Sequence, residues 1–440
     1  MNWTQLLSTK RFGMEDYHEK RADDRSEFQR DYDRLIFSAP FRRMQNKTQV
    51  FPLPGSIFVH NRLTHSLEVA CVGRSLGVNV ARQLQAKGIS APFLDEIGSI
   101  VSAACLAHDM GNPPFGHSGE KAIASYFSEG QGQDLEQTMT AEEWKDIICY
   151  EGNANAFRLL THQFKGRRKG GFVLTYSTLA AIVKYPYASI HSDVKKQKFG
   201  FFDSEKSDYE KIANELGIIT LPENNNRFAR HPLVYLVEAA DDICYQIMDI
   251  EDAHKLRILT TDETKNLMLN FFDEKRKSRI QETMNIVTDV NEQISYLRSS
   301  VIGKLIDQCS DAFVANEEKI LNGTLSLSLI KIIPENSVAA YQNCSKTAFD
   351  KIYRSQEVLD VELAGYKIII TLLEHLVSAV LTPEKAYSKQ LLMRIPEQYV
   401  SENTSNYGRI MSVLDYISGM TDIYALDLYR KITGMNIPSL

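Results

Sequence analysis

The chain has few of the features that mark disulfide-stabilised or low-complexity proteins. Its six cysteines are widely spaced and form no Cys-x-x-Cys pair, which argues against a disulfide framework. Only 23 glycines and 13 prolines interrupt 440 residues, and we find neither a repeat of fixed period nor a low-complexity tract. Several cysteines fall inside apolar helical patterns, where a free thiol behaves as a small hydrophobe. A reducing compartment fits this usage best.

Long uncharged apolar runs are also missing. The N-terminal segment has no extended apolar region and no small-residue cleavage site, so we expect no secretory signal. The most apolar late stretch, residues 366–381, is interrupted by Lys367, Glu374 and His375 and falls short of a membrane span. We therefore expect a cytoplasmic protein with no membrane partner.

An excess of charge of one sign is absent as well. The chain carries 50 basic and 56 acidic residues, for a formal net charge of −6, and 43% of its residues are hydrophobic. This balance argues against a chain that coats nucleic acid, but it permits a local basic pocket. A length of 440 residues exceeds what one core usually organises. We predict a catalytic core over residues 1–255 and a helical C-terminal region over residues 256–440.

The spacing of apolar residues predicts an all-α protein. Apolar residues recur at i, i+3, i+4 and i+7 over long segments, as expected of amphipathic helices. The clearest predicted helices span residues 67–84, 97–107, 233–250 and 358–381. Strand-like patches are few, and each is short enough only for a hairpin. They are residues 171–176, 199–202 and 218–221.

The dipeptide His108-Asp109 follows the almost wholly apolar helix predicted over residues 97–107. Gly111 and the two prolines after it prevent the helix from continuing. A buried carboxylate without a partner costs several kcal/mol, and coordination of a metal ion is one of the few remedies. The alternative is that His108 merely caps the C-terminal end of the helix, where a cation is favoured.

Two further residues complete a candidate metal set. His65 shares a helical face with apolar residues, which is also typical of an ordinary core histidine. Asp241 borders the apolar stripe of the helix predicted over residues 233–250, whereas Asp249 taken alone is typical of the solvent-facing side. Together with His108 and Asp109, these residues offer two imidazoles and two carboxylates. Such a set suits a first-row transition metal and, with additional water, magnesium.

Seven blocks of sequence stand out, in order, between about Arg25 and Tyr424. They are RSEFQRDYDRLIFSAPFRRMQNKTQVFP, NRLTHSLEVACVGR, AHDMGNPPFGHSGE, EGNANAFR, YSTLAAIVKYP, EAADDICYQIMDIEDA and SGMTDIYAL. Together they resemble the dGTP triphosphohydrolases of the HD superfamily of metal-dependent phosphohydrolases. The resemblance implies an all-α HD fold, a divalent metal such as Mg²⁺ or Mn²⁺, and hydrolysis of dGTP, with other dNTPs as further candidates, to deoxynucleoside and triphosphate.

The resemblance also implies a role for individual residues. It makes His65, His108, Asp109 and Asp241 the metal ligands, and it makes His117 and Glu120 the catalytic histidine and its supporting carboxylate. His117 either protonates the leaving 5′-oxygen, which we favour, or activates the water. The implied substrate contacts are Gln49 and Asp249 to the sugar 3′-hydroxyl, Arg62 and Lys184 to the phosphates, Tyr245 near the deoxyribose and phosphates, and Asn112 as a further polar contact.

Other functions remain open at this point. Within the same superfamily, a nucleotide phosphodiesterase or nucleotidase is the alternative enzyme. Basic clusters at residues 165–169, 195–198 and 275–279 raise a non-enzymatic alternative, single-stranded nucleic-acid binding, but they lack interleaved aromatics and are more typical of a solvated surface. Single-stranded DNA is a candidate regulator. The resemblance further implies a homo-oligomer, with a hexamer as one arrangement.

Overall fold

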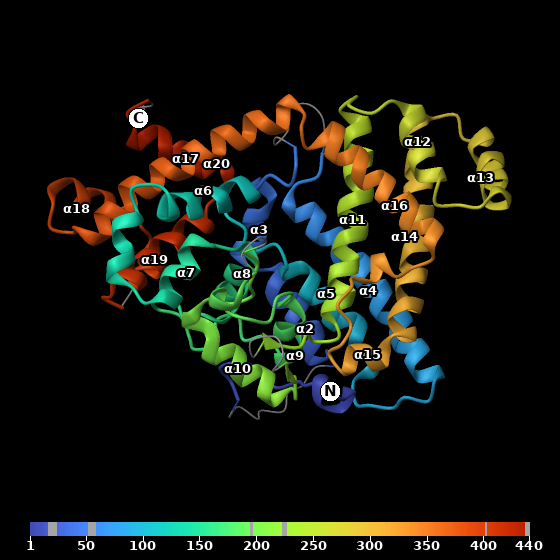
Figure 1. Cartoon of the computed structure of the whole chain (residues 1–440), viewed down its shortest axis with the longest axis horizontal. Helices are drawn as coiled ribbons and strands as arrows, with labels where there is room; N and C mark the ends of the chain where they lie inside the picture. The colour runs from blue at the N-terminus through green and yellow to red at the C-terminus, as the bar shows by residue number, and fades with distance from the viewer. Residues whose placement is uncertain (16–23, 52–58, 194–196, 222–226, 401–402, 436–440) are drawn as a thin grey trace.

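Helices make up nearly all the regular structure of the chain in the computed structural model (Figure 1). The structure describes residues 1–15, 24–51, 59–193, 197–221, 227–400 and 403–435. The N-terminus lies beside α15, at the opposite side of the molecule from α20. The predicted all-α class is confirmed.

The helices divide between the two halves of the chain. The first half contains α1 (Trp3–Leu6), α2 (Glu27–Ile36), α3 (Ala39–Arg43), α4 (Arg62–Ala86), α5 (Ile97–Ala107), α6 (Gly116–Ser128), α7 (Ala141–Ile148), α8 (Gly152–Thr161), α9 (Tyr176–Ile182) and α10 (Lys206–Glu215). The second half contains α11 (Val234–Lys255), α12 (Thr261–Leu269), α13 (Glu274–Ile286), α14 (Val290–Ala315), α15 (Glu317–Leu321), α16 (Glu335–Thr347), α17 (Gln356–Leu381), α18 (Ala386–Leu392), α19 (Asn406–Ser418) and α20 (Asp422–Ile432). Short 3₁₀ turns connect many of them.

The four helices predicted from apolar spacing are confirmed, with differences at their ends. Helix α5 has the predicted bounds, α11 begins one residue later and ends five residues later than predicted, and α17 begins two residues earlier. Helix α4 begins five residues earlier than predicted because Asn61 and Thr64 form a reciprocal capping pair. Arg62 is therefore the first residue of α4, rather than lying outside it.

Only one of the three predicted strand segments forms a strand. Residues Thr220–Leu221 (β1) pair antiparallel with Arg227–Phe228 (β2). The predictions over residues 171–176 and 199–202 are wrong, since each makes a single isolated bridge. Their apolar residues serve burial instead: Phe199 and Phe202 are fully buried, and Thr175 caps α9. Short apolar runs do not distinguish a strand from a buried connection.

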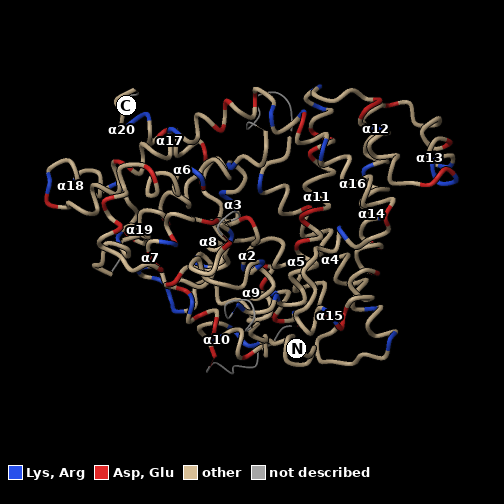
Figure 2. The backbone as a smooth tube through the Cα atoms, in the orientation of Figure 1, with Lys and Arg blue, Asp and Glu red and all other residues tan. Residues whose placement is uncertain are grey.

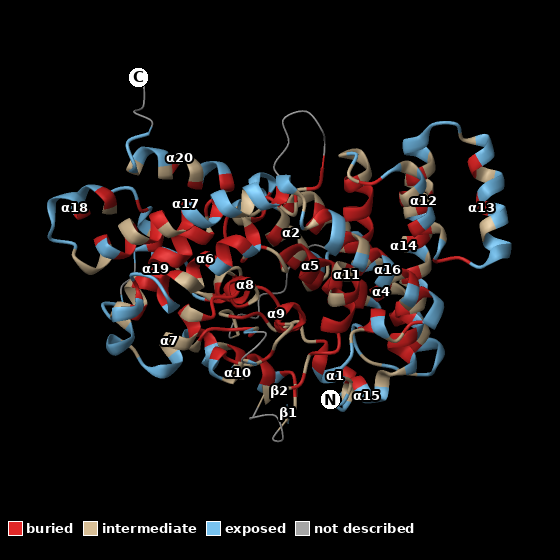
Figure 3. Ribbon diagram, turned by 45° about the horizontal axis from the view of Figure 1, so that its top comes forward, coloured by how far each residue is buried: buried red, intermediate tan, exposed pale blue. Residues whose placement is uncertain are grey.

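The close pairing of α4 and α5 organises the N-terminal half of the chain. A Cβ atom on Gly77 would lie 2.6 Å from the Cα of Gly98, so these two glycines let the helices approach closely. The helices run antiparallel, because Gly73 of α4 contacts Cys105 of α5 further along the same interface. The start of α4 consequently meets the end of α5. Helix α11 packs against both, and every residue of α5 except Ser99 is buried (Figure 3).

The C-terminal half packs in two places. Helices α12, α14 and α16 lie beside α4 and α11, whereas α17, α19 and α20 lie on the other side of the molecule near α6 (Figure 1). Helix α11 ends at Lys255, the position at which we predicted a domain boundary. The division into residues 1–255 and 256–440 stays a prediction.

Helix α17 differs from the expectation for residues 366–381. Within the described part of the chain, it is the one helix whose length and composition would allow it to cross a membrane. Half of its most apolar window is buried, and it packs against α6, α18, α19 and α20. Its apolar side therefore belongs to a hydrophobic core shared with these helices.

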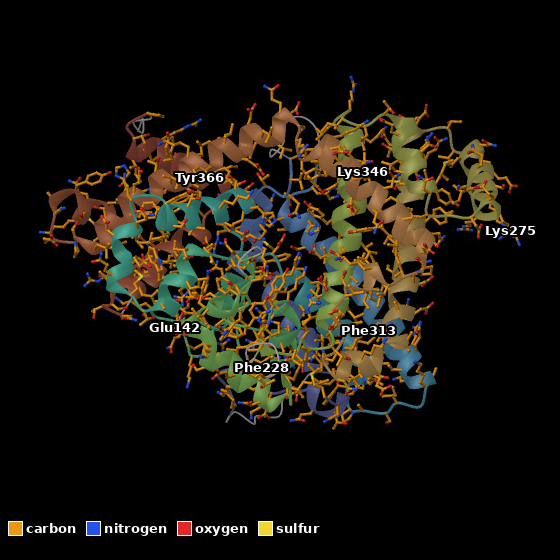
Figure 4. The ribbon with its side chains drawn as sticks, viewed as in Figure 1. Glu142, Phe228, Lys275, Phe313, Lys346 and Tyr366 are labelled. Atoms are coloured by element: carbon orange, nitrogen blue, oxygen red, sulfur yellow. The ribbon has the colours of Figure 1, made fainter. Side chains whose placement is uncertain are left out.

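The mixed distribution of charged residues and the free cysteines agree with what the sequence predicted. Lys and Arg are interspersed with Asp and Glu along the backbone (Figure 2). Lys275, from one of the predicted basic clusters, lies at the outer edge of the molecule on α13 (Figure 4). All six cysteines are free, and Cys71 is the exposed one.

Candidate active site

A cavity of about 280 Å³ opens where α4, α5, α6 and α11 converge. Ten of the twelve residues assigned to the site from the sequence line it. They are Gln49, Arg62, His108, Asp109, Asn112, His117, Glu120, Lys184, Asp241 and Tyr245. His65 and Asp249 are not in the lining, and both are nearly fully buried.

Two histidines and two carboxylates lie close together at this cavity, with His65 just behind its lining. The Nε2 atom of His65 lies 3.1 Å from Oδ1 of Asp241, and Nε2 of His108 lies 3.6 Å from the same oxygen. Asp109 approaches His108 at 3.7 Å. Ligand atoms of His65, His108 and Asp109 all lie within 4.8 Å of one another. These residues come from α4, α11 and the end of α5, so only the packing of the three helices brings them together.

The orientation of His108 fits a metal ligand. Its Nδ1 atom donates to the carbonyl oxygen of Cys105 at 2.6 Å, which caps the last turn of α5 and turns Nε2 toward the carboxylates. That Nε2 atom is buried and has no hydrogen-bond partner among the described residues. Burial lowers the pKa of His108, but the charges of Asp109 and Asp241 outweigh it and raise the pKa to about 9. His108 can therefore cap α5 through Nδ1 and bind a metal ion through Nε2, so the two interpretations do not exclude each other.

Asp109 is held from two sides. Arg62 donates to Oδ2 at 2.7 Å, and the side-chain amide of Asn112 donates to Oδ1 at 2.5 Å. Burial raises the pKa of Asp109, yet the positive charge of Arg62 outweighs that effect and lowers the pKa to about 2. The pKa of Asp241 is likewise held well below its usual range, because the two histidines overcome burial. Both carboxylates are therefore anionic at neutral pH, as ligands of a divalent cation must be.

His117 and Glu120 form a pair at the rim of the cavity. Nδ1 of His117 lies 2.9 Å from Oε2 of Glu120, one turn further along α6. The His117 side chain is 72% exposed, whereas that of Glu120 is 9% exposed and also accepts from the backbone N–H of Gly152. The hydrogen bond and negative charge of Glu120 raise the pKa of His117 above its ordinary value. The fixed carboxylate thus orients an imidazole that remains accessible to a ligand.

A tight turn places this pair beside Arg62. Phe115, directly before α6, has a left-handed backbone with φ of 61°, and Gly116 follows with φ of 55°. A Cβ atom on Gly116 would lie 2.5 Å from a guanidinium nitrogen of Arg62. Glycine is therefore required at this position both by its backbone angle and by the space that Arg62 occupies.

The remaining substrate-binding candidates occupy different walls. Nζ of Lys184 pairs with Glu238 at 3.3 Å. The Oε1 atom of Gln49 is buried and has no hydrogen-bond partner among the described residues. The ring of Tyr245 stacks on Tyr353 at 6.0 Å. Asp249 lies one turn beyond Tyr245, outside the cavity lining, and accepts from the Tyr353 hydroxyl at 2.7 Å. Its assigned contact with the sugar stays a prediction.

The structure adds lining residues that sequence reasoning missed. Lys198 pairs with Glu151 at 2.5 Å and lies 3.9 Å from Glu120, so a half-buried lysine and two buried glutamates lie next to His117. The sequence placed Lys198 in a basic cluster typical of a solvated face or loop; it lies in a loop, but its half-buried side chain pairs with Glu151. Lys195 and Lys196 lie outside the described residues. Glu151 stands in the block EGNANAFR and Tyr185 directly follows Lys184, which were the available signals.

Comparisons with known proteins agree with this architecture. Residues 62–165 match the HD domain, and residues 332–431 match the phosphohydrolase-associated domain. A deoxyguanosinetriphosphate triphosphohydrolase-like protein of Pseudomonas aeruginosa is 37% identical over 451 residues, which cover 100% of both chains. The chain belongs to the deoxyguanosinetriphosphate triphosphohydrolase family.

Other members of the family span almost the whole chain too. The triphosphohydrolase-like protein of Synechocystis is 35% identical over 462 residues, covering 99% of this chain and 100% of its own. The deoxyguanosinetriphosphate triphosphohydrolase of Yersinia enterocolitica is 30% identical over 516 residues, covering 98% and 99%. The chain is a hydrolase of the HD type, and its donor set of imidazoles and carboxylates suits the metal that such domains use. The resemblance inferred from the sequence is confirmed.

Proposed function

We propose that the protein hydrolyses dGTP to deoxyguanosine and inorganic triphosphate. The observation that carries this proposal is the convergence of His65, His108, Asp109 and Asp241 at the floor of one cavity lined by cationic side chains. Relatives named deoxyguanosinetriphosphate triphosphohydrolases match the chain from end to end, which supports the same substrate. The metal, Mg²⁺, Mn²⁺ or a similar ion, would be held by these four residues.

The proposed reaction breaks the bond between the α-phosphorus and the 5′-oxygen. Water adds its hydroxyl group to the phosphorus, and the 5′-oxygen leaves with a proton. The bound divalent ion would polarise the α-phosphate and lower the pKa of water. His117 donates the proton to the leaving oxygen in our preferred assignment, since Glu120 keeps its imidazole protonated to higher pH. Activation of the water is its alternative role.

The cationic side chains of the cavity would neutralise the three phosphates. Arg62 offers a planar fork for bidentate contacts, and Lys184, which also lines the cavity, offers a point charge. Lys198 adds a third positive charge next to the catalytic pair. Asn112 would contribute a neutral amide, and Gln49 and Asp249 would hold the sugar 3′-hydroxyl.

Tyr245 is the residue that we expect to exclude ribonucleotides. Its stacking on Tyr353 fixes the ring at the cavity wall, where packing against C2′ would leave no space for a 2′-hydroxyl. Tyr245→Ala should therefore raise kcat/KM for GTP relative to dGTP, by about tenfold or more if the steric clash costs at least 1.4 kcal/mol. Tyr245→Phe keeps the ring and serves as the control. Equal discrimination by wild type and Tyr245→Ala would contradict the assignment.

Product analysis tests the proposed function directly. Purified protein is incubated with each dNTP and Mn²⁺ or Mg²⁺, and the released phosphate species are separated by anion exchange. Triphosphate as the sole phosphate product, with dGTP the best substrate, supports the proposal. Pyrophosphate or orthophosphate would instead indicate the alternative, an HD-type nucleotide phosphodiesterase or nucleotidase.

We also propose a cytoplasmic homo-oligomer, with a hexamer as one arrangement, and single-stranded DNA as a regulator. These proposals rest on the family resemblance, because Lys and Arg are interspersed with Asp and Glu along the backbone (Figure 2). Light scattering of the purified protein measures the oligomer. Binding of a labelled oligonucleotide that does not weaken with salt would contradict an electrostatic contact with DNA.

A further inference from the structure

A turn near the C-terminus is buried against two segments that line the cavity. Residues 418–422 connect α19 to α20, and the side chain of Asp422 lies at the first position of α20 with only 5% of the residue exposed. Thr421 already caps this helix by accepting from the N–H of Tyr424. The carboxylate of Asp422 is therefore free to serve residues outside its own helix.

Asp422 joins the two segments through both of its oxygens. Oδ2 accepts from the backbone N–H of Thr48 at 2.8 Å and from its hydroxyl at 2.6 Å, although 374 positions separate the residues. Oδ1 accepts from the backbone N–H of Phe115 at 2.9 Å. Thr48 directly precedes Gln49, and Phe115 stands two residues before His117. One carboxylate thus fixes the distance between these two parts of the site.

A buried lysine forms a second connection at the same turn. Nζ of Lys47, of which 3% is exposed, donates to the carbonyl oxygens of Asn112 and Ser418, each at 2.6 Å. The backbone of Lys47 also accepts from the N–H of Arg62. The 47–49 segment is consequently attached to the start of α4, to the loop before α6 and to the C-terminal turn.

Helix α17 supports the start of α6 from the outside. The Phe115 ring occupies the space that a side chain at Gly365 would need, since a Cβ atom there would lie 2.5 Å from the ring. Ser118 donates to the carbonyl oxygen of Glu362 at 2.6 Å. Phe115 has a left-handed backbone that residues other than glycine rarely adopt, so these contacts hold an unfavourable conformation in place.

We propose that Asp422 is a positioning residue, which sets the Gln49 segment and the His117 end of α6 at their working separation. The inference rests on the proposed triphosphohydrolase function and deepens it. Asp422 touches none of the four candidate metal ligands. Its loss should therefore impair proton transfer by His117 and the contact of Gln49 with the sugar. A displacement of about 1 Å in such groups lowers a rate by as much as about a hundredfold.

The substitution Asp422→Asn tests this assignment at constant size. The amide has a single acceptor oxygen, so either Thr48 or Phe115 loses its partner and faces an NH₂ group instead. We expect kcat for dGTP to fall about tenfold to a hundredfold, while the affinity for Mn²⁺ changes less than about twofold. Asp427→Asn is the matched control: it makes the same change on the same helix, at an exposed residue paired with Lys431.

Amide hydrogen exchange supplies a readout that is independent of activity. In Asp422→Asn, exchange should quicken in peptides covering residues 45–50 and 112–118, and stay as in wild type in α5 and α11. Thr48→Val, which loses only the hydroxyl donor, should show a smaller loss of kcat, and Thr48→Ser should restore the wild-type value. These two variants test the same contact if Asp422→Asn does not fold.

Several outcomes would overturn the assignment. They are a kcat for Asp422→Asn within twofold of wild type, exchange that quickens uniformly across the core, and Thr48→Ser and Thr48→Val behaving alike. A wild-type protein that releases no triphosphate from any dNTP would refute the proposed function instead. The exchange experiment would then still decide whether Asp422 fixes the two segments.

Discussion

Replacing His108 or Asp109 by alanine should reduce triphosphate release by about a thousandfold or more. Loss of one ligand weakens the site that stabilises charge on the α-phosphate, and each 1.4 kcal/mol of lost stabilisation lowers the rate about tenfold. Both residues are central to the cluster, because His108 approaches both carboxylates and Asp109 is held by Arg62. The measurement is kcat with dGTP at saturating Mn²⁺, together with metal content by mass spectrometry.

The controls separate a lost metal site from a lost fold. His375→Ala, on α17, removes an imidazole that packs on Tyr387 away from the cavity lining, and should retain both metal and activity. Treatment of wild type with EDTA should abolish turnover, and added Mn²⁺ should restore it. Retention of full metal content and activity by both His108→Ala and Asp109→Ala would refute the proposed metal site.

Substitution of His117 should have the second largest effect, for a different reason. His117→Gln removes the proton-transfer group, and such groups contribute about 10²- to 10⁴-fold to rate. The affinity for the metal should remain unchanged, because His117 pairs with Glu120 and not with the cluster at the cavity floor. Kinetics with dGTP and metal titration of the same preparation check both parts. A kcat within tenfold of wild type would contradict a catalytic role.

The pH dependence of Glu120→Gln should reveal which role His117 has. Glu120 raises the pKa of His117, and glutamine keeps an acceptor for the N–H of Gly152 while removing the charge. The pKa of His117 should therefore fall. If His117 is the acid, activity is lost as pH rises through its pKa, and this alkaline limb moves to lower pH in the variant. If His117 activates water, the acid limb moves to lower pH instead.

Local sequence was sufficient where structure depends on near neighbours. The bounds of α5 were predicted correctly because an almost wholly apolar run is followed within a few residues by glycine and two prolines. The start of α4 was misplaced because its capping pair, Asn61 and Thr64, precedes the apolar residues that reveal the helix. The strand predictions over residues 171–176 and 199–202 failed because short buried connections share the composition of strands.

The environment of individual side chains was less predictable. Lys198 belongs to a basic run in the sequence, yet its pairing with Glu151 draws it into the cavity. Asp249 lies on the same side of α11 as Asp241 and Tyr245, but Tyr353 takes its carboxylate as a hydrogen-bond partner. Burial raises the pKa of that carboxyl to about 7. Such outcomes depend on which helix packs opposite, and helical periodicity does not contain that information.

The amino-acid sequence by itself determined the helical class, the chemical character of the site and the family, because periodicity, residue type and motif order can be read along one chain. Tertiary structure alone decided that the beginning of α4 meets the end of α5, through the contact of Gly77 with Gly98, and that Asp241 completes the cluster. It also decided that Asp422 reaches Thr48 across most of the chain. Contacts between distant residues follow from how helices pack in three dimensions, and local sequence patterns do not specify that packing.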